Sequence, residues 1–325
     1  MDKKVWVFLL LGLALVLPVL ALADGHVTWV YTYDPADGPE GIATDRKGNI
    51  FVSFPWSGQV RRIARDGSES LFYDFAANYP GTLPLGMGTD RQGNLYVNVT
   101  TFGGPGSGVY RINWQGEAEL LPGSENILNP NGMTFDAQGN LYITEAFVIG
   151  SDPPAGAVWR IPRNGAAEMW LGPEEILGGV GYLPPPRTPI GANGITYYHN
   201  TIYVANTEKG YIVQVPVLPD GSPGEPSILV GAEGDPELLW LDDIRVDVHG
   251  TIYAALIVQD RIVAIDPDTG EITDLAGAAD GLSGPASLAF GKVHATQKSL
   301  FFTNSGYTTG QAGVLRLYVG VPGRP

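Results

Sequence analysis

A short phrase recurs six times along this chain of 325 residues. Its copies begin at residues 39, 84, 130, 192, 241 and 285, as PEGIATD, PLGMGTD, PNGMTFD, ANGITYY, LDDIRVD and PASLAFG. Successive copies start 45, 46, 62, 49 and 44 residues apart. A period of this length is typical of the four-stranded blades of a β-propeller, and it is too long for leucine-rich or ankyrin repeats. We therefore expect an all-β, six-bladed propeller.

Each copy reads as a strand, a tight turn and a second strand. Alternating apolar residues such as Ile50-Phe51-Val52 indicate half-buried strands. The Asp-x-x-Gly-Asn between the strands predicts a hairpin turn, because Asp bonds nearby backbone groups and Gly accepts a positive φ. Two more strands follow in each copy except the last, which has only three strands in all. We expect residues 26–33 to supply the missing strand, so that the ring closes without an open sheet edge.

The first 23 residues have the features of a secretory signal peptide. Lys3 and Lys4 precede an apolar run from Val5 to Leu20, and Ala21-Leu22-Ala23 offers a cleavage site before Asp24. The alternative is an uncleaved anchor, since the run is long enough to span a bilayer. We expect cleavage, which leaves residues 24–325 as one propeller domain, secreted or periplasmic, and no longer bound to a membrane.

The charge and the lack of cysteine exclude several classes of function. The chain has 34 acidic and 19 basic residues, a formal net charge of −15, and no cysteine. Such a surface repels phosphate backbones, so we expect no nucleic-acid partner. Without cysteine there are no disulfides, no thiolate nucleophile and no Cys-ligated zinc. We expect a monomer.

The residue after the first position of each repeat varies in an informative way. In a propeller the first strand of each blade lines the central axis, so these six residues form one ring: Glu40, Leu85, Asn131, Asn193, Asp242 and Ala286. Two carboxylates facing each other across a narrow channel repel, and a bound cation would remove that repulsion. Two carboxylates and two amide oxygens suit Ca²⁺, with waters completing its shell, better than Mg²⁺, which requires a stricter octahedron. The predicted metal ligands are Glu40, Asn131, Asn193 and Asp242.

A simpler interpretation of the two Asn-Gly pairs is turn chemistry, because Asn-Gly is a common hairpin dipeptide. The hairpin turn of the third repeat, however, is already assigned to the region of Gly139-Asn140. Both Asn-Gly pairs also occupy the same register as Glu40 and Asp242. Both interpretations remain open at this stage.

The whole mature chain resembles the senescence-marker-protein/gluconolactonase (regucalcin-like) propellers, with kinship to diisopropylfluorophosphatase and paraoxonase. The resemblance rests on PEG, PNG, ANG and LDD in register, together with the phrases Leu-Asp-Asp-Ile and Pro-Ala-Ser-Leu-Ala-Phe-Gly. It implies a calcium-dependent hydrolase of lactones or related esters, with the metal on the axis. The histidine pair of paraoxonase-like enzymes has no counterpart here, since none of the four histidines is placed near the ring.

A count of residues outward from each hairpin turn predicts which residue of the second strand lies opposite each ring residue. It pairs Asn131 with Glu145 and Asn193 with Asn206, which would place a third carboxylate and a further amide beside the axis. Glu145 and Asp242 are then the candidate catalytic bases, although an exposed strand-end acid is an equally good interpretation of Glu145. Three aromatic residues on the same end, Trp56, Tyr182 and Trp240, are candidates for substrate binding or for packing.

Two functions therefore remain in view. The first is an exported, calcium-dependent lactone or ester hydrolase that acts on a small molecule. The alternative is a non-catalytic, calcium-stabilised propeller that binds a protein or small ligand at its rim, because the fold alone does not decide.

Overall fold

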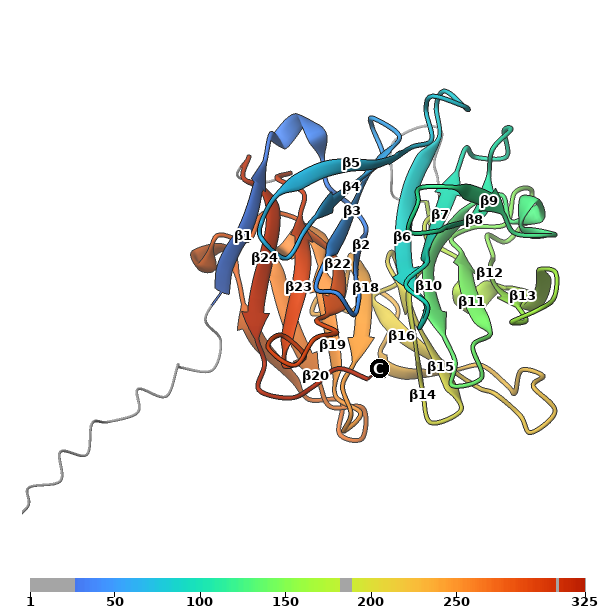
Figure 1. The fold of residues 1–325 in the computed structure, drawn as a ribbon. Helices are drawn as coiled ribbons and strands as arrows, with labels where there is room; N and C mark the ends of the chain where they lie inside the picture. Colours follow the sequence, from blue (N-terminus) through green and yellow to red (C-terminus); the bar gives the residue numbers. More distant parts are fainter. Residues whose placement is uncertain (1–26, 182–188, 308–309, 325) are drawn as a thin grey trace, which may run out of the picture.

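The computed structural model describes residues 27–181, 189–307 and 310–324. These residues form six four-stranded antiparallel sheets arranged around a central axis (Figure 1). The six-bladed, all-β propeller predicted from the repeat is confirmed. The predicted signal peptide, residues 1–23, lies outside the described residues, as does Tyr182. Among the described residues no helix is long and apolar enough to span a membrane.

The strands follow one another from the axis outward in each of the first five blades, which are numbered here in chain order. Blade 1 contains β2 (Ile42–Thr44), β3 (Ile50–Phe54), β4 (Gln59–Ile63) and β5 (Glu69–Asp74). Blade 2 contains β6 (Leu83–Thr89), β7 (Leu95–Thr100), β8 (Gly108–Ile112) and β9 (Ala118–Leu120). Blade 3 contains β10 (Pro130–Phe135), β11 (Leu141–Glu145), β12 (Gly156–Ile161) and β13 (Glu168–Glu174).

Blades 4 and 5 repeat this order, and short 3₁₀ turns connect several strands. Blade 4 contains β14 (Ala192–Tyr198), β15 (Thr201–Asn206), β16 (Tyr211–Pro216) and β17 (Ser227–Gly231). Blade 5 contains β18 (Leu241–Val246), β19 (Ile252–Leu256), β20 (Arg261–Ile265) and β21 (Ile272–Ala276). The turns are η1 (Pro35–Asp37), η2 (Ser124–Asn126), η3 (Glu175–Leu177), η4 (Ile257–Gln259) and η5 (Ala278–Asp280).

Blade 6 joins the two ends of the chain. It contains β22 (Pro285–Phe290), β23 (Ser299–Asn304) and β24 (Ala312–Tyr318), and its outer strand is β1 (Val27–Tyr33). β1 pairs antiparallel with β24, from Val27 opposite Leu317 to Tyr33 opposite Ala312. The predicted closure by the N-terminal strand is therefore confirmed.

The predicted turn chemistry is present between the first two strands of blades 1, 2 and 3. In blade 1, Asp45 Oδ1 accepts hydrogen bonds from the backbone N–H groups of Lys47 (2.9 Å) and Asn49 (2.8 Å). Gly48 has a φ of +88°, a conformation that residues with a side chain rarely adopt. These turns fix where each inner strand ends, and hence the register of the whole ring.

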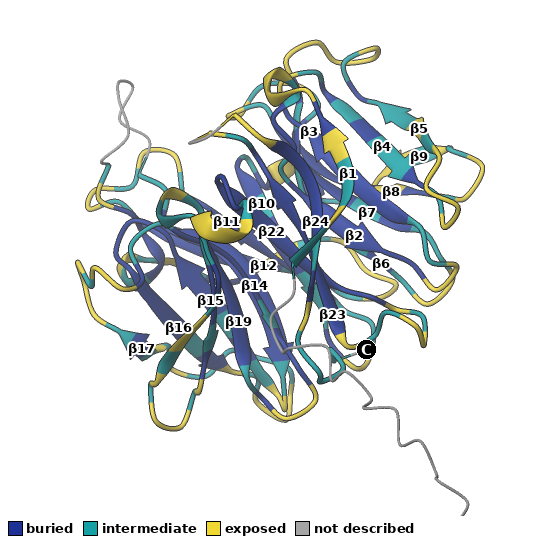
Figure 2. Cartoon of the chain, turned by 90° about the vertical axis from the view of Figure 1, so that its left-hand side faces the viewer, coloured by how far each residue is buried: buried dark blue, intermediate teal, exposed yellow. Residues whose placement is uncertain are grey.

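The hydrophobic core lies between adjacent blades. Each core cluster joins residues of neighbouring sheets, for example Tyr142 and Val158 of blade 3 with Ile195 and Val204 of blade 4. The inner strands are mostly buried and the loops at both ends are exposed (Figure 2). We call the end where the inner strands begin the mouth end, and the end with the turns around Asp45, Asp90 and Asp136 the hairpin end.

Candidate functional site

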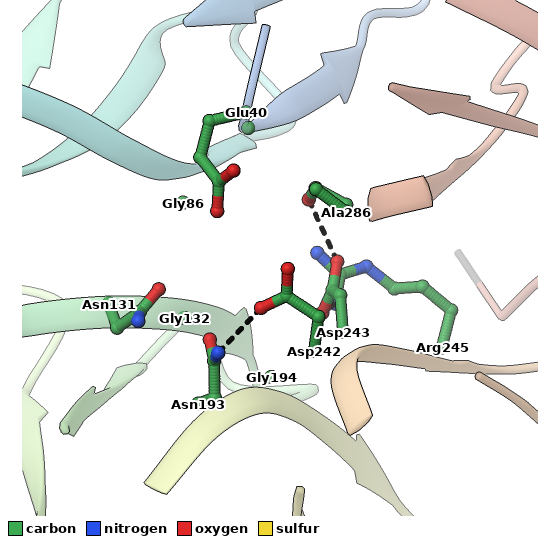
Figure 3. A pocket seen from close by; sticks show the side chains of 12 residues that line it. Glu40, Gly86, Asn131, Gly132, Asn193, Gly194, Asp242, Asp243, Arg245 and Ala286 are labelled. Atoms are coloured by element: carbon green, nitrogen blue, oxygen red, sulfur yellow. Dashed lines mark hydrogen bonds and ion pairs between the residues drawn. The ribbon is translucent and has the colours of Figure 1, made fainter. Parts of the chain in front are cut away.

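A small pocket lies on the axis at the mouth end (Figure 3). Its free volume is about 10 Å³, which is room for about one water-sized species. All four predicted metal ligands line it: Glu40, Asn131, Asn193 and Asp242. Ala286, of the same ring, and the residues that follow the ring positions complete the lining. The ring that was inferred from the repeat is thus a physical cluster in the fold.

Each inner strand of blades 2 to 6 has a β-bulge at the ring position. In blade 3, Pro130 pairs with Glu145 and Met133 pairs with Ile143, so Asn131 and Gly132 together oppose the single residue Thr144. The same one-residue shift occurs at the ring positions of blades 2, 4, 5 and 6. A bulge of this kind redirects a side chain. Here it turns the ring residue toward the axis.

The glycine that follows the ring residue has a steric cause. A Cβ atom on Gly41, Gly86 or Gly132 would lie 2.0, 2.2 or 2.4 Å from the ring carbonyl of the next blade. Real Cβ atoms do not approach an oxygen that closely, so only glycine fits. The glycine of the repeated Pro-x-Gly is therefore required by the close approach of neighbouring inner strands at the mouth.

Hydrogen bonds between blades fix the backbone of the ring. Ser53 Oγ donates to Leu85 O (2.9 Å), Asn98 Nδ2 to Asn131 O (2.7 Å) and Thr144 Oγ1 to Asn193 O (2.6 Å). Each donor comes from the second strand of one blade and each acceptor is a ring residue of the next. The ring side chains are consequently held on a backbone that is rigid before any ligand binds.

The two ring carboxylates are held in an unfavourable environment. Asp242 is buried, and its pKa lies well above its usual value because of burial, then the nearby Glu40 and Asp243 carboxylates. A hydrogen bond from Asn193 Nδ2 to Asp242 Oδ1 (2.5 Å) partly offsets this effect. Burial and the charge of Asp243 also raise the pKa of Glu40. Negative charge at this point is therefore costly unless a cation accompanies it.

Asp243 and Arg245, which follow the ring residue Asp242, form an ion pair that the sequence pattern did not predict. Asp243 Oδ2 accepts hydrogen bonds from Ser287 Oγ (2.8 Å) and Leu288 N (2.9 Å) of blade 6, and Arg245 Nη1 contacts Asp243 Oδ1 at 2.6 Å. Asp243 thus points away from Asp242, toward the contact between blades 5 and 6. Arg245 also lines the pocket, and the repeat pattern did not predict a basic group there. The bulge explains the omission, because simple strand alternation does not bring Arg245 to the axis.

The donor set fits a hard divalent cation. Four side chains converge on the pocket from four different blades, and each carries an oxygen atom (Figure 3). Two carboxylates and two amides match the all-oxygen preference of Ca²⁺, and waters from the mouth would complete its coordination. Within the described part of the chain, no group of three or more His, Cys, Asp or Glu side chains could hold a metal. The amide oxygens are therefore essential to this candidate site.

The predicted pairing of Asn131 with Glu145 is wrong by one residue, because the bulge shifts the register at the ring. Glu145 is buried and accepts hydrogen bonds from Leu128 N (3.1 Å) and Trp159 Nε1 (2.8 Å). It is not among the residues that line the axial pocket. Its contacts anchor the segment before β10, so the geometric argument for Glu145 as the catalytic base no longer holds.

Glu145→Gln should lower stability and leave calcium affinity unchanged. Gln has one acceptor oxygen for two buried donors, so one N–H loses its partner, at a cost of about 1–3 kcal/mol. Urea denaturation should show this loss, and Glu145→Gln should cost less in a Trp159→Phe background, since Trp159→Phe removes one of the two donors. Unchanged stability together with weakened calcium binding would contradict this assignment.

The other predicted pairing, Asn193 with Asn206, is shifted in the same way, since Asn206 pairs with Ala192. Asn206 is fully buried and donates from Nδ2 to Ile176 O (3.2 Å) and Gly178 O (3.1 Å). Its Oδ1 accepts from Lys209 N (3.0 Å). Asn206 therefore holds the loop between blades 3 and 4, and it does not line the pocket.

Of the predicted aromatic residues, Trp56 and Trp240 lie on loops at the mouth end but do not line the pocket. Trp56 is 68% exposed and packs over Gly38. Trp240 is half-buried, with a φ of +65°, in the loop before β18. Tyr307 was not singled out as a substrate contact. Burial and then the charges of Glu40 and Asp242 raise the pKa of the Tyr307 hydroxyl, and a hydrogen bond with the Trp56 side chain lowers it.

Solved structures share this architecture. A gluconolactonase from Xanthomonas campestris has a TM-score of 0.62 at 17% identity, covering 92% of this chain and 89% of that one. The calcium-binding protein regucalcin from Agrobacterium tumefaciens has a TM-score of 0.66 at 14% identity, covering 93% and 98%. The chain has the fold of the gluconolactonase- and regucalcin-like propellers.

The fold is also shared with a protein of different chemistry. A virginiamycin B lyase from Staphylococcus aureus, solved with quinupristin, has a TM-score of 0.56 at 15% identity and covers 86% of this chain and 81% of its own. No protein-family model matches the sequence. No curated protein is significantly similar to it. At these identities the likeness establishes the fold, and the chemistry must be argued from the site.

Proposed function

We propose that this protein is an exported, calcium-dependent hydrolase of lactones or related esters. The observation that carries the proposal is the axial pocket, where two carboxylates and two amides from four blades meet around space for one ion. The gluconolactonase and regucalcin neighbours support the same class of chemistry. Residues 1–23, which carry the features of a signal peptide, support export.

Glu40, Asn131, Asn193 and Asp242 would hold the ion. When bound, calcium supplies Lewis acidity toward a substrate carbonyl. The protein positions a small substrate over the ring, and the loops carrying Trp56 and Trp240 border the mouth. Because Glu145 does not line the pocket, Asp242 is our candidate for the residue that accepts a proton from a water molecule at the mouth.

The test is hydrolysis of a panel of aldonolactones, alkyl lactones and aryl esters by the chain, with calcium and with excess EGTA. The proposal predicts turnover with calcium, its loss in EGTA and its recovery when calcium is restored. Calcium should also raise Tm, because it binds the folded state alone. A calcium-dependent rise in Tm without turnover of any substrate would instead support the alternative function, a calcium-stabilised binding propeller.

A further inference from the structure

Cations occupy one turn position in three neighbouring blades. The sixth residue after the ring position is Lys292 in blade 6, Arg46 in blade 1 and Arg91 in blade 2. At the same position blades 3, 4 and 5 have Ala137, His199 and Val248. All three basic residues are exposed at the hairpin end, although Lys292 Nζ also donates to Thr89 O (3.1 Å) and Thr89 Oγ1 (2.7 Å). Because this turn position does not require a basic residue, the pattern singles out one sector of the ring.

Further cations lie in the same sector. Lys47, Arg65 and Lys298 are exposed and Arg316 is half-buried. Together with Lys292, Arg46 and Arg91 they form what we call the basic sector. Among the described residues, none of its members has a carboxylate partner within ion-pair distance. A set of unpaired cations is unexpected in a protein whose net charge is −15.

The acidic residues of the same turns already have partners. Asp45 accepts from Lys47 N, Asn49 N and Asn49 Nδ2, at 2.7–2.9 Å. Asp90 makes the equivalent bonds at 2.8–2.9 Å. These carboxylates shape the turns, and the cations beside them remain available to an external anion.

The basic sector borders a cleft between blades 6 and 1. The cleft has a volume of about 330 Å³ and is lined by Arg65, Lys292 and Arg316. The indole of Trp29, on the closing strand, is directed away from this end, toward Gly281 and Gly313. Three basic side chains along one cleft suit the anionic headgroups of a bilayer.

The chain enters the propeller at this same end. β1 begins at Val27, which pairs with Leu317 near the hairpin end of β24 (Figure 1). Six residues separate Leu20, the last residue of the apolar run, from Val27. Six residues span at most about 20–25 Å even when fully extended. An apolar run held in a bilayer would therefore bring the basic sector close to the lipid phosphates.

We infer that the basic sector docks the propeller on an anionic phospholipid surface, with the axial pocket facing away from the membrane. The acidic remainder of the protein is repelled by such a surface, so electrostatics selects this one orientation. The inference departs from the expectation of a mature protein free of the membrane. It does not depend on the proposed hydrolase activity.

The test uses residues 24–325, since all six blades lie within that range. The protein is sedimented with vesicles of phosphatidylcholine alone or with phosphatidylglycerol added. Binding is expected only with phosphatidylglycerol, and it should be lost at high salt, which screens surface charge. Arg46→Gln/Arg91→Gln should weaken this binding by about 20- to 30-fold, from about fivefold per basic residue.

The control is Arg61→Gln/Arg261→Gln, which removes the same charge near the mouth end, where the two arginines pair with Asp37 and Glu237. This control should bind within about twofold of the unmodified protein. Several outcomes would overturn the inference: no binding to phosphatidylglycerol vesicles at low salt, equal binding to both vesicle types, or equal loss in both double variants. Tight binding to heparin or polyphosphate without vesicle binding would also overturn it, in favour of a soluble polyanion.

Discussion

Asp242→Asn should abolish calcium binding by the chain and reduce lactone turnover by at least about 10²-fold. The change removes one of the two ring carboxylates that would bind the ion, whereas the third carboxylate of the lining, Asp243, is paired with Arg245. Isothermal titration with calcium and initial-rate kinetics measure the two effects. Glu40→Gln should abolish calcium binding in the same way.

The change in Tm, measured with and without calcium, distinguishes a metal ligand from a residue that only stabilises the fold. In the calcium-free protein, Asp242→Asn removes a buried charge close to Glu40 and Asp243, so Tm should stay the same or rise. The rise in Tm that calcium gives the unmodified protein should disappear. Glu125→Gln, an exposed acid in the mouth-end turn η2, is the control and should keep both calcium affinity and activity. Calcium affinity retained in Asp242→Asn would refute the proposed metal site.

Deleting residues 27–33 should prevent folding of the propeller. Without β1, the strand β24 becomes an exposed edge from Ala312 to Leu317, and exposed edges promote aggregation. Blade 1 also loses a contact, because the ring of Tyr33 packs edge-on against Phe54 at 4.8 Å. Size-exclusion chromatography and circular dichroism should show aggregated or unfolded protein.

The control for this deletion is removal of residues 1–26 alone, which should leave a folded monomer. An added peptide with the sequence of residues 27–33 provides a second measurement. If β1 acts by completing blade 6, co-refolding with this peptide should restore part of the soluble protein. A soluble, cooperatively folded protein that lacks β1 and needs no peptide would contradict the closure mechanism.

The sequence by itself determined the architecture and the composition of the axial ring. Propeller blades are built from contacts close in sequence, namely the Asp-x-x-Gly-Asn turns and the alternating strands, so one period repeated six times was sufficient. Aligned repeats also place equivalent residues on one ring. Glu40, Asn131, Asn193 and Asp242 could therefore be brought together from spacing alone, and the structure places them around one pocket.

Only the tertiary structure decided what surrounds that ring. The β-bulges at the ring positions of blades 2 to 6 are stabilised by contacts between blades, such as Thr144 Oγ1 with Asn193 O (2.6 Å). A residue count within one hairpin considers one blade at a time, so it predicted Asn131 as the partner of Glu145 in place of Pro130. The same bulge brings Arg245 to the axis beside Asp243 (2.6 Å). Local pattern fixes which residues recur, whereas close packing between blades fixes where their side chains point.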